Sequence, residues 1–151
     1  TRMTGDLVLA MRRCPQPIIA LVQGAAAGGG FALALAADIR IATRSARMNC
    51  AFIKLGLGGC DIGTSYFLPR LVGVSVASEL ILTGRFIGAE RALGVGLVSE
   101  VVEEGELEAA AEPYVDAMMT ASPVLGSLDM VSVWASRSSA QALSAGSGFS
   151  A

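Results

Sequence analysis

The stretch Gln16-Pro-Ile-Ile-Ala-Leu-Val-Gln23, continued by Gly24-Ala-Ala-Ala-Gly-Gly-Gly30 and Phe31-Ala-Leu-Ala-Leu-Ala-Ala37, decides the fold. Its first part is short, apolar and bounded by proline and glycine, which predicts a strand buried on both faces. Residues 31–37 are strong helix formers, and Asp38-Ile-Arg-Ile-Ala-Thr43 alternates with a period of two. We therefore expect a strand, a glycine-rich turn, a helix and a second strand, and a crossover helix makes the two strands parallel.

The composition is that of one folded domain. The chain has 151 residues, of which 53% are hydrophobic and 16% charged, and chains of about 150 residues bury roughly two thirds of their unfolded surface. A net charge of −2 with scattered basic residues provides no surface for nucleic acid. The chain contains no histidine, which excludes a Ser-His-Asp triad and the commonest zinc ligand.

The cysteines and one long uncharged stretch indicate the cellular compartment of the protein and whether it crosses a membrane. Cys14, Cys50 and Cys60 are odd in number and have no metal-ligand spacing. Free thiols in a reducing compartment fit this better than disulfides, so we expect a cytoplasmic protein without a metal site. Residues 14–37 are long enough to cross a bilayer. Their prolines, their glycines and Gln23 argue against that alternative, and we expect no membrane segment.

Beyond the second strand, the pattern predicts mostly helices. Residues 64–71 should form a helix shortened or kinked by Pro69, Gly73 should break the chain, and a further helix should cover 74–82. A brief helix over 89–93, a strand over 96–102 and a helix over 106–121 that Pro113 disturbs should follow. The end of the chain is rich in Ser, Ala and Gly. We therefore divide the chain into a core over 1–122 and an atypical, loosely held segment over 123–151.

Two features have residue types suited to chemistry. Glycines 28–30 stand between a strand and a helix, where bare backbone lets an anionic ligand approach the N–H groups of a helix N-terminus. Close packing of helix on sheet explains the same glycines equally well. Asp61 stands in a glycine-rich, apolar neighbourhood, where a buried carboxyl can take up and return a proton at neutral pH. The alternative is that Asp61 caps the helix beginning near Thr64.

Several blocks of the sequence, taken together, resemble the crotonase superfamily, the enoyl-CoA hydratase/isomerase group. They cover residues 17–30, 35–40, 56–57, 68–73, 79–84 and 92–99. The resemblance implies an α/β fold, a crotonase-like (ClpP/crotonase) spiral of strand-strand-helix units with a helical C-terminal part, present here as the C-terminal portion. It also implies a homotrimer or hexamer and an acyl-CoA thioester as partner. Coenzyme A would be part of the substrate, with no separate cofactor.

The resemblance also assigns roles to residues. The backbone N–H of Gly29 would be one of two oxyanion donors that polarise the thioester carbonyl, and one such donor is typically worth about 2.7 to 4 kcal/mol. The second donor of family members lies in a loop upstream of the position of Thr1. The substrate-binding residues would be Ala27, Gly28, Gly30, Phe52, Leu57 and Ile62. A purely structural core role is the alternative for the last three. Candidates for contact with CoA phosphates, or simply for solvated surface cations, are Arg12, Arg13 and Lys54.

Departures from the family pattern narrow the chemistry. Hydratases of this family activate water with two glutamates, and Ala32 and Phe52 stand at those positions here. Asp61 stands where enoyl-CoA isomerases keep an acid, so we expect double-bond isomerisation through a thioester enolate, with Asp61 as acid and base. Aryl-CoA dehalogenase chemistry would need a histidine that the chain lacks. True hydratase activity is as strongly disfavoured as dehalogenase chemistry. The alternative from another class is a catalytically silent crotonase-like fragment that acts in assembly or binding.

Overall fold

The computed structural model describes residues 2–56, 61–121 and 132–136. The helices are α1 (Arg2–Arg13), α2 (Gly29–Ala36), α3 (Thr64–Thr83), α4 (Ala89–Gly94) and α5 (Leu107–Ala121). Two short 3₁₀ turns are η1 (Ala51–Leu55) and η2 (Asp61–Gly63). The strands are β1 (Ile18–Val22), β2 (Ala25–Ala27), β3 (Ile39–Thr43), β4 (Arg47–Asn49), β5 (Ile87–Gly88), β6 (Glu100–Val102) and β7 (Ser132–Ser136).

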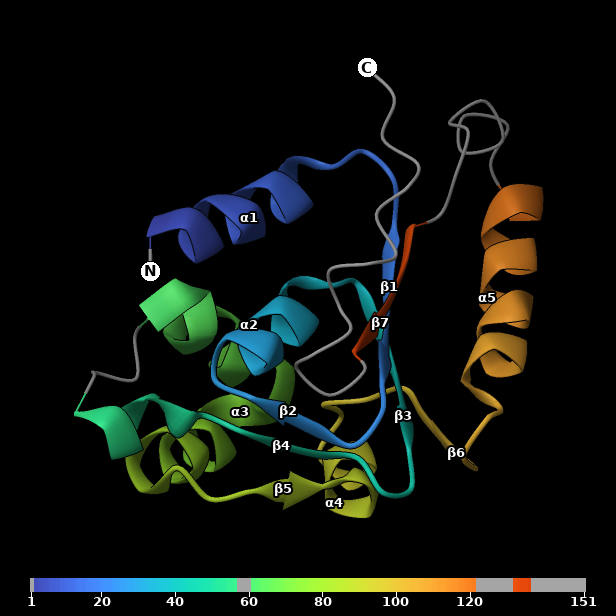
Figure 1. The fold of residues 1–151 in the computed structure, drawn as a ribbon. Coiled ribbons are helices and arrows are strands. Elements are labelled where there is room, and N and C mark those ends of the chain that lie inside the picture. Colours follow the sequence, from blue (N-terminus) through green and yellow to red (C-terminus); the bar gives the residue numbers. More distant parts are fainter. Residues whose placement is uncertain (1, 57–60, 122–131, 137–151) are drawn as a thin grey trace.

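These strands form two sheets (Figure 1). The larger sheet has the order β6-β3-β1-β7 and is parallel throughout. The smaller has the order β2-β4-β5, in which β2 and β4 are parallel and β5 is antiparallel. The chain places one strand in the large sheet, the next in the small sheet and then a helix, first as β1-β2-α2 and again as β3-β4-α3. The expected α/β spiral of strand-strand-helix units is confirmed.

All residues of β1 are buried because helices cover both faces of the large sheet. Ile18, Ala20 and Val22 pack in the core that includes α2 and α3. Ile19 and Leu21 instead pack in a second core with residues of α5. Figure 1 shows α5 on one side of the sheet and α1 and α2 on the other. Alternate residues of one strand therefore serve two separate cores.

Helix α2 is the centre of the larger core. Phe31, Ala34 and Leu35 are buried in it, and two further alanines of the same helix are also buried. The helix begins at Gly29, two residues earlier than the helix-forming stretch predicts. Tertiary packing of the apolar helix outweighs the poor helix propensity of glycine, which costs about 1 kcal/mol relative to alanine.

Arg40 places a buried guanidinium where α2, β3 and the segment after α4 meet. Its side chain donates to the carbonyl oxygens of Ala37 (2.6 Å), Leu97 (2.7 Å) and Ala34 (3.3 Å). Burial lowers the pKa of Arg40, while the Asp38 carboxylate acts in the opposite direction. The carbonyls compensate the cost of removing this cation from water. Arg40 therefore ties the end of α2 to the large sheet.

Asp38 joins α1 to the start of β1. Its Oδ2 accepts the Ile18 N–H at 2.9 Å, and its Oδ1 lies 2.9 Å from Nη1 of Arg12. The same Nη1 donates to the Ala36 carbonyl oxygen at 3.1 Å. Arg12 is thus engaged in an ion pair within the fold, and its contact with a CoA phosphate stays a prediction.

Several local features differ from the sequence predictions. Strand β2 forms inside the stretch expected to be a turn, and β4 and β5 were not predicted because strands of two or three residues carry too little periodicity. Gly73 breaks the helical conformation with a φ of 79°, as predicted, although α3 is one element across it. Helix α5 continues through Pro113, whose ring is exposed, so the prediction that this proline disturbs the helix is wrong. Gly63, rather than Thr64 or Asp61, is the N-cap of α3.

Helix α3 is the one helix, within the described ranges, that is long and apolar enough to cross a bilayer by length and composition. It is interrupted at Gly73 and carries Arg70 and Glu79. The stretch 14–37 forms β1, β2 and α2 rather than one helix. In the atypical segment 123–151, β7 pairs with β1 in parallel, which the sequence pattern did not predict. The remaining residues of that segment lie outside the described ranges.

Replacing Phe31 by alanine should lower the free energy of unfolding by about 3–5 kcal/mol, because Phe31 is fully buried at the centre of the larger core. Urea denaturation followed by circular dichroism measures this loss. The control is Leu82→Ala, since Leu82 is 71% exposed and its removal should change the free energy by no more than about 0.5 kcal/mol. Equal losses for the two variants would contradict the position of α2 in the core.

Candidate functional site: the start of helix α2

Gly28 turns the chain from β2 into α2 with a φ of 54° and a ψ of −115°. A residue with a Cβ rarely adopts this conformation, so the turn requires glycine. The Gly28 N–H donates to the Asn49 carbonyl of β4 at 3.1 Å, and the Gly28 carbonyl accepts the Ala32 N–H at 3.0 Å. The second of these bonds is the first of the helix. Gly28 therefore sets the point and the direction at which α2 begins.

The N–H groups of Gly29 and Gly30 have no acceptor in the part of the chain that the structure describes. They belong to the first turn of α2, whose N–H groups lack intrahelical partners. That turn contains no acidic residue, and its N-cap makes no side-chain hydrogen bond. Within the helix and its cap, no group therefore compensates the positive end of the helix dipole. Two N–H donors at such an end can stabilise an oxygen that carries negative charge.

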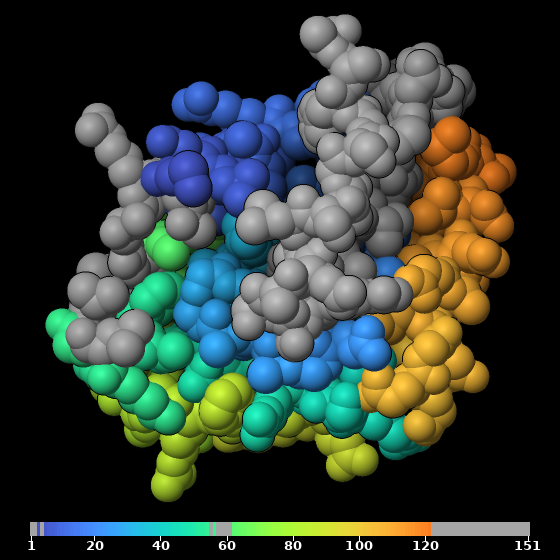
Figure 2. Space-filling model, viewed as in Figure 1, coloured from blue at the N-terminus to red at the C-terminus, as the bar shows by residue number. Residues whose placement is uncertain are grey.

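The surroundings of these glycines are apolar and partly open. A Cβ added to Gly28 would lie 3.8 Å from both Cε1 of Phe52 and Cβ of Ala51. Phe52 is 5% exposed, whereas Ala27 at the end of β2 is exposed. Figure 2 shows β2 and the start of α2 at the surface of this face, below α1. The backbone of Gly28, Gly29 and Gly30 is thus only partly buried.

Asp61 begins η2, a turn that packs against α1, α2 and α3. The next residue, Ile62, has a φ of 55° and a ψ of 30°. This left-handed conformation is strained for a β-branched side chain, and such strain often accompanies a functional site. The turn η2 thus packs on α2, the helix that begins at Gly29. Leu57 lies outside the described residues.

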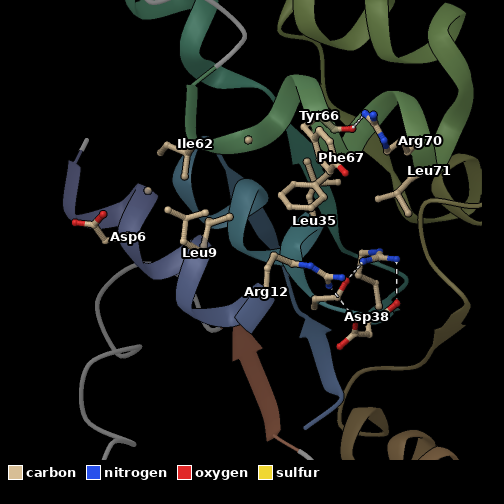
Figure 3. Close-up of a pocket in the computed structure, with 15 residues that line it drawn as sticks. Asp6, Leu9, Arg12, Leu35, Asp38, Ile62, Tyr66, Phe67, Arg70 and Leu71 are labelled. Carbon is tan, nitrogen blue, oxygen red and sulfur yellow. Dashed lines mark hydrogen bonds and ion pairs between the residues drawn. The ribbon is translucent and has the colours of Figure 1, made fainter. Parts of the chain in front are cut away.

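A cavity of about 910 Å³ adjoins η2 and lies between α1, the C-terminal end of α2 and the first turns of α3 (Figure 3). Ile62 lines it, together with Leu35, Phe67 and Leu71. Phe52 and the three glycines are not among its lining residues. Of the residues expected to bind substrate, Phe52 therefore lies beside Gly28, whereas Ile62 lines this cavity. The polar and charged residues that line it are Asp6, Arg12, Asp38, Arg40, Tyr66 and Arg70.

Sequence reasoning missed Asn49, which supports the start of α2. Its backbone carbonyl holds the Gly28 N–H, and its buried side chain donates from Nδ2 to the Gly84 carbonyl at 3.2 Å. Its Oδ1 has no hydrogen-bond partner among the described residues. A polar residue at the end of a three-residue strand gives no sequence signal of this position. Asn49 links the site to the C-cap of α3.

Cys50 follows Asn49 and is buried. Burial raises the pKa of its thiol to about 11, so the thiol is protonated at neutral pH and provides no nucleophile there. Lys54, suggested for a CoA phosphate, has its Nζ 5.9 Å from the centroid of the Phe86 ring. Among the described residues, the groups of the site that are suited to chemistry are therefore its backbone N–H groups.

A family of known proteins matches most of the chain. The family description "Enoyl-CoA hydratase/isomerase" matches residues 2–144. The chain belongs to this family. It is 51% identical over 102 residues to a probable enoyl-CoA hydratase of Mycobacterium tuberculosis, which is 68% of this chain and 36% of that protein.

Solved structures of enoyl-CoA hydratase/isomerase proteins have the same fold. One from Cupriavidus metallidurans superposes with a TM-score of 0.75 at 38% identity, over 85% of this chain and 52% of that one. A monofunctional enoyl-CoA isomerase of M. smegmatis superposes with a TM-score of 0.67 at 44% identity, over 74% and 52% of the two chains. The chain thus spans about half, or less, of the length of these relatives.

Replacing Gly28 by alanine should lower the free energy of unfolding by about 1–3 kcal/mol, because the added Cβ has room but its backbone conformation is strained. Gly30→Ala is the matched control, since Gly30 is helical and nothing lies within 4 Å of its added Cβ. That variant should be unchanged or slightly more stable. Urea denaturation of the two variants measures their stabilities. A Gly28→Ala protein as stable as the wild type would refute the strained turn.

Proposed function

We propose that this chain binds an acyl-CoA thioester at the start of α2 and supports isomerisation of a double bond in the acyl group. The observation that carries the proposal is the half-buried Gly29 N–H at the start of α2, which has no acceptor among residues 2–56, 61–121 and 132–136. A thioester oxygen gains negative charge when a proton leaves the neighbouring carbon. A donor placed there binds the enolate more strongly than the ground-state ester, which is the condition for catalysis.

Asp61 is the proposed acid and base. The proposal is supported by the packing of η2 on α2 and by the strained conformation of Ile62 directly after Asp61. In a 3-enoyl thioester, the carboxylate would remove a proton from the α-carbon and form a dienolate. The same carboxylic acid would return the proton to the γ-carbon and leave the double bond conjugated with the carbonyl. One carboxylate suffices, and no water is consumed.

Hydration is disfavoured by the residues at the positions where hydratases of the family carry glutamates. Ala32 is 0% exposed and Phe52 is 5% exposed, so both positions are apolar and buried. A hydratase must orient and deprotonate a water molecule, and neither side chain can do so. Similarity to the M. smegmatis isomerase agrees with this choice, although other relatives bear the name hydratase.

A catalytically silent role in assembly or binding is the second candidate. It is favoured by exposed apolar side chains of α3, of which Val74 and Leu82 are 72% and 71% exposed. Apolar surface of this kind can serve contacts between chains, and the expected trimer or hexamer would bury such residues. We also propose a cytoplasmic location for either function, because Cys14 and Cys50 are free thiols.

Asp61→Asn should abolish deuterium incorporation at the α- and γ-carbons of a 3-enoyl-CoA incubated with the protein in heavy water. The expected loss is about 10²–10⁴-fold, the usual contribution of a general acid–base. Affinity for the ester should change little, because the asparagine keeps the size of the side chain. Exchange is followed by mass spectrometry and NMR.

Asp116→Asn is the control for this experiment, since Asp116 is exposed on α5, and it should keep the full exchange rate. Exchange at the wild-type rate in Asp61→Asn would remove Asp61 from the mechanism. No exchange in the folded wild-type protein would favour the silent role.

A further inference from the structure

Arg70 presents an oriented guanidinium at the edge of the cavity beside η2. Its Nη1 donates to the Tyr66 carbonyl oxygen at 2.7 Å, and its Cζ lies 3.7 Å from the centroid of the Tyr66 ring. It forms no ion pair with any side chain in the described ranges. The two contacts with Tyr66 fix the plane of the guanidinium and leave its other N–H groups available.

The other charged groups of the cavity are engaged or distant. Arg12 is paired with Asp38, and Arg40 donates to backbone carbonyls. Asp6 is exposed and, in Figure 3, lies at the opposite end of the cavity from Arg70. Three arginines face two aspartates around the cavity. Of these described groups, Arg70 is therefore the one available to bind an incoming anion.

The wall between η2 and Arg70 is apolar. Leu35, Phe67 and Leu71 line it, and Figure 3 shows their side chains gathered between α2 and α3. The volume of about 910 Å³ lies within the range of small-molecule sites. From Gly29 to Leu35 the axis of α2 rises by roughly 9 Å, at about 1.5 Å per residue. An extended chain of about eight carbons spans that distance.

We propose that the cavity selects acyl groups that end in a carboxylate, and that Arg70 binds this carboxylate. The inference rests on the proposed function, since the acyl group would enter as a CoA thioester anchored at Gly29. The apolar wall contacts the methylene chain, and the planar guanidinium offers a carboxylate two parallel hydrogen bonds. Stacking on Tyr66 reduces the side-chain entropy lost on binding.

The test compares two unreactive esters of equal length, octanoyl-CoA and suberyl-CoA, which differ in the terminal carboxylate. Calorimetric titration of the whole chain with each ester gives the affinities. Arg70→Gln should weaken suberyl-CoA binding about ten-fold, the effect expected for one charge-assisted contact at a partly exposed site. The same change should leave octanoyl-CoA binding within about two-fold. Arg70→Lys should restore part of the loss, because it keeps the charge without the planar fork.

Arg85→Gln is the matched control, since Arg85 is exposed and does not line the cavity, and it should leave both affinities unchanged. An equal loss for both esters in Arg70→Gln would show that Arg70 binds a CoA phosphate and would overturn the inference. Unchanged binding of both esters would also overturn it, while leaving thioester binding at Gly29 intact. Failure of the folded wild-type chain to bind either ester would refute the proposed function and, with it, this inference.

Discussion

The backbone of Gly28, with its φ of 54°, determines where α2 begins and therefore where the N–H groups of Gly29 and Gly30 point, which have no acceptor among the residues that the structure describes. The conformation is held from outside the helix, because the Gly28 N–H is bound to the Asn49 carbonyl of the neighbouring strand. The small sheet is thus more than a connection between repeats. By pairing β2 with β4, it fixes the turn from which the helix starts.

The opposite end of α2 is fixed by two charged residues. Arg40 binds the carbonyls of Ala34 and Ala37, and Asp38 joins the end of the helix to α1 and β1. Loss of the Arg40 guanidinium would leave buried carbonyl groups without partners, which costs more than the net value of the bonds themselves. A rigid, almost fully buried helix is useful at an oxyanion site, because donors that need not reorganise stabilise developing charge most strongly.

Much of this fold could be predicted because its strongest signals are local. The apolar run of β1, the glycine-rich turn and the alternation of β3 specify a parallel crossover without any tertiary information. The small sheet could not be predicted, since β5 has two residues and depends on its partner for its conformation. The start of α2 at Gly29 was likewise set by tertiary packing rather than by propensity. Helix α5 passes through Pro113 because the ring lies on its exposed face.

The candidate site could be predicted from the sequence only in part. Gly29 could be inferred from spacing between a strand and a helix, whereas Asp61 depended on resemblance to the family. Asn49 and Arg70 could not be found in this way, because their roles arise from neighbours distant in sequence, as with Asn49 and Gly28, or from a cavity formed by three helices. Ordinary polar residues acquire such roles only when the chain folds.

The polarisation of a bound thioester carbonyl tests the central claim most directly. Isotope-edited infrared difference spectra of butyryl-CoA carrying a ¹³C thioester carbonyl should show the C=O stretch at lower frequency when the ester binds the wild-type chain. The shift arises because the N–H groups at the start of α2 withdraw electron density from the C=O bond. An unshifted carbonyl band in a sample shown to hold the ester would mean that the start of α2 is not an oxyanion site.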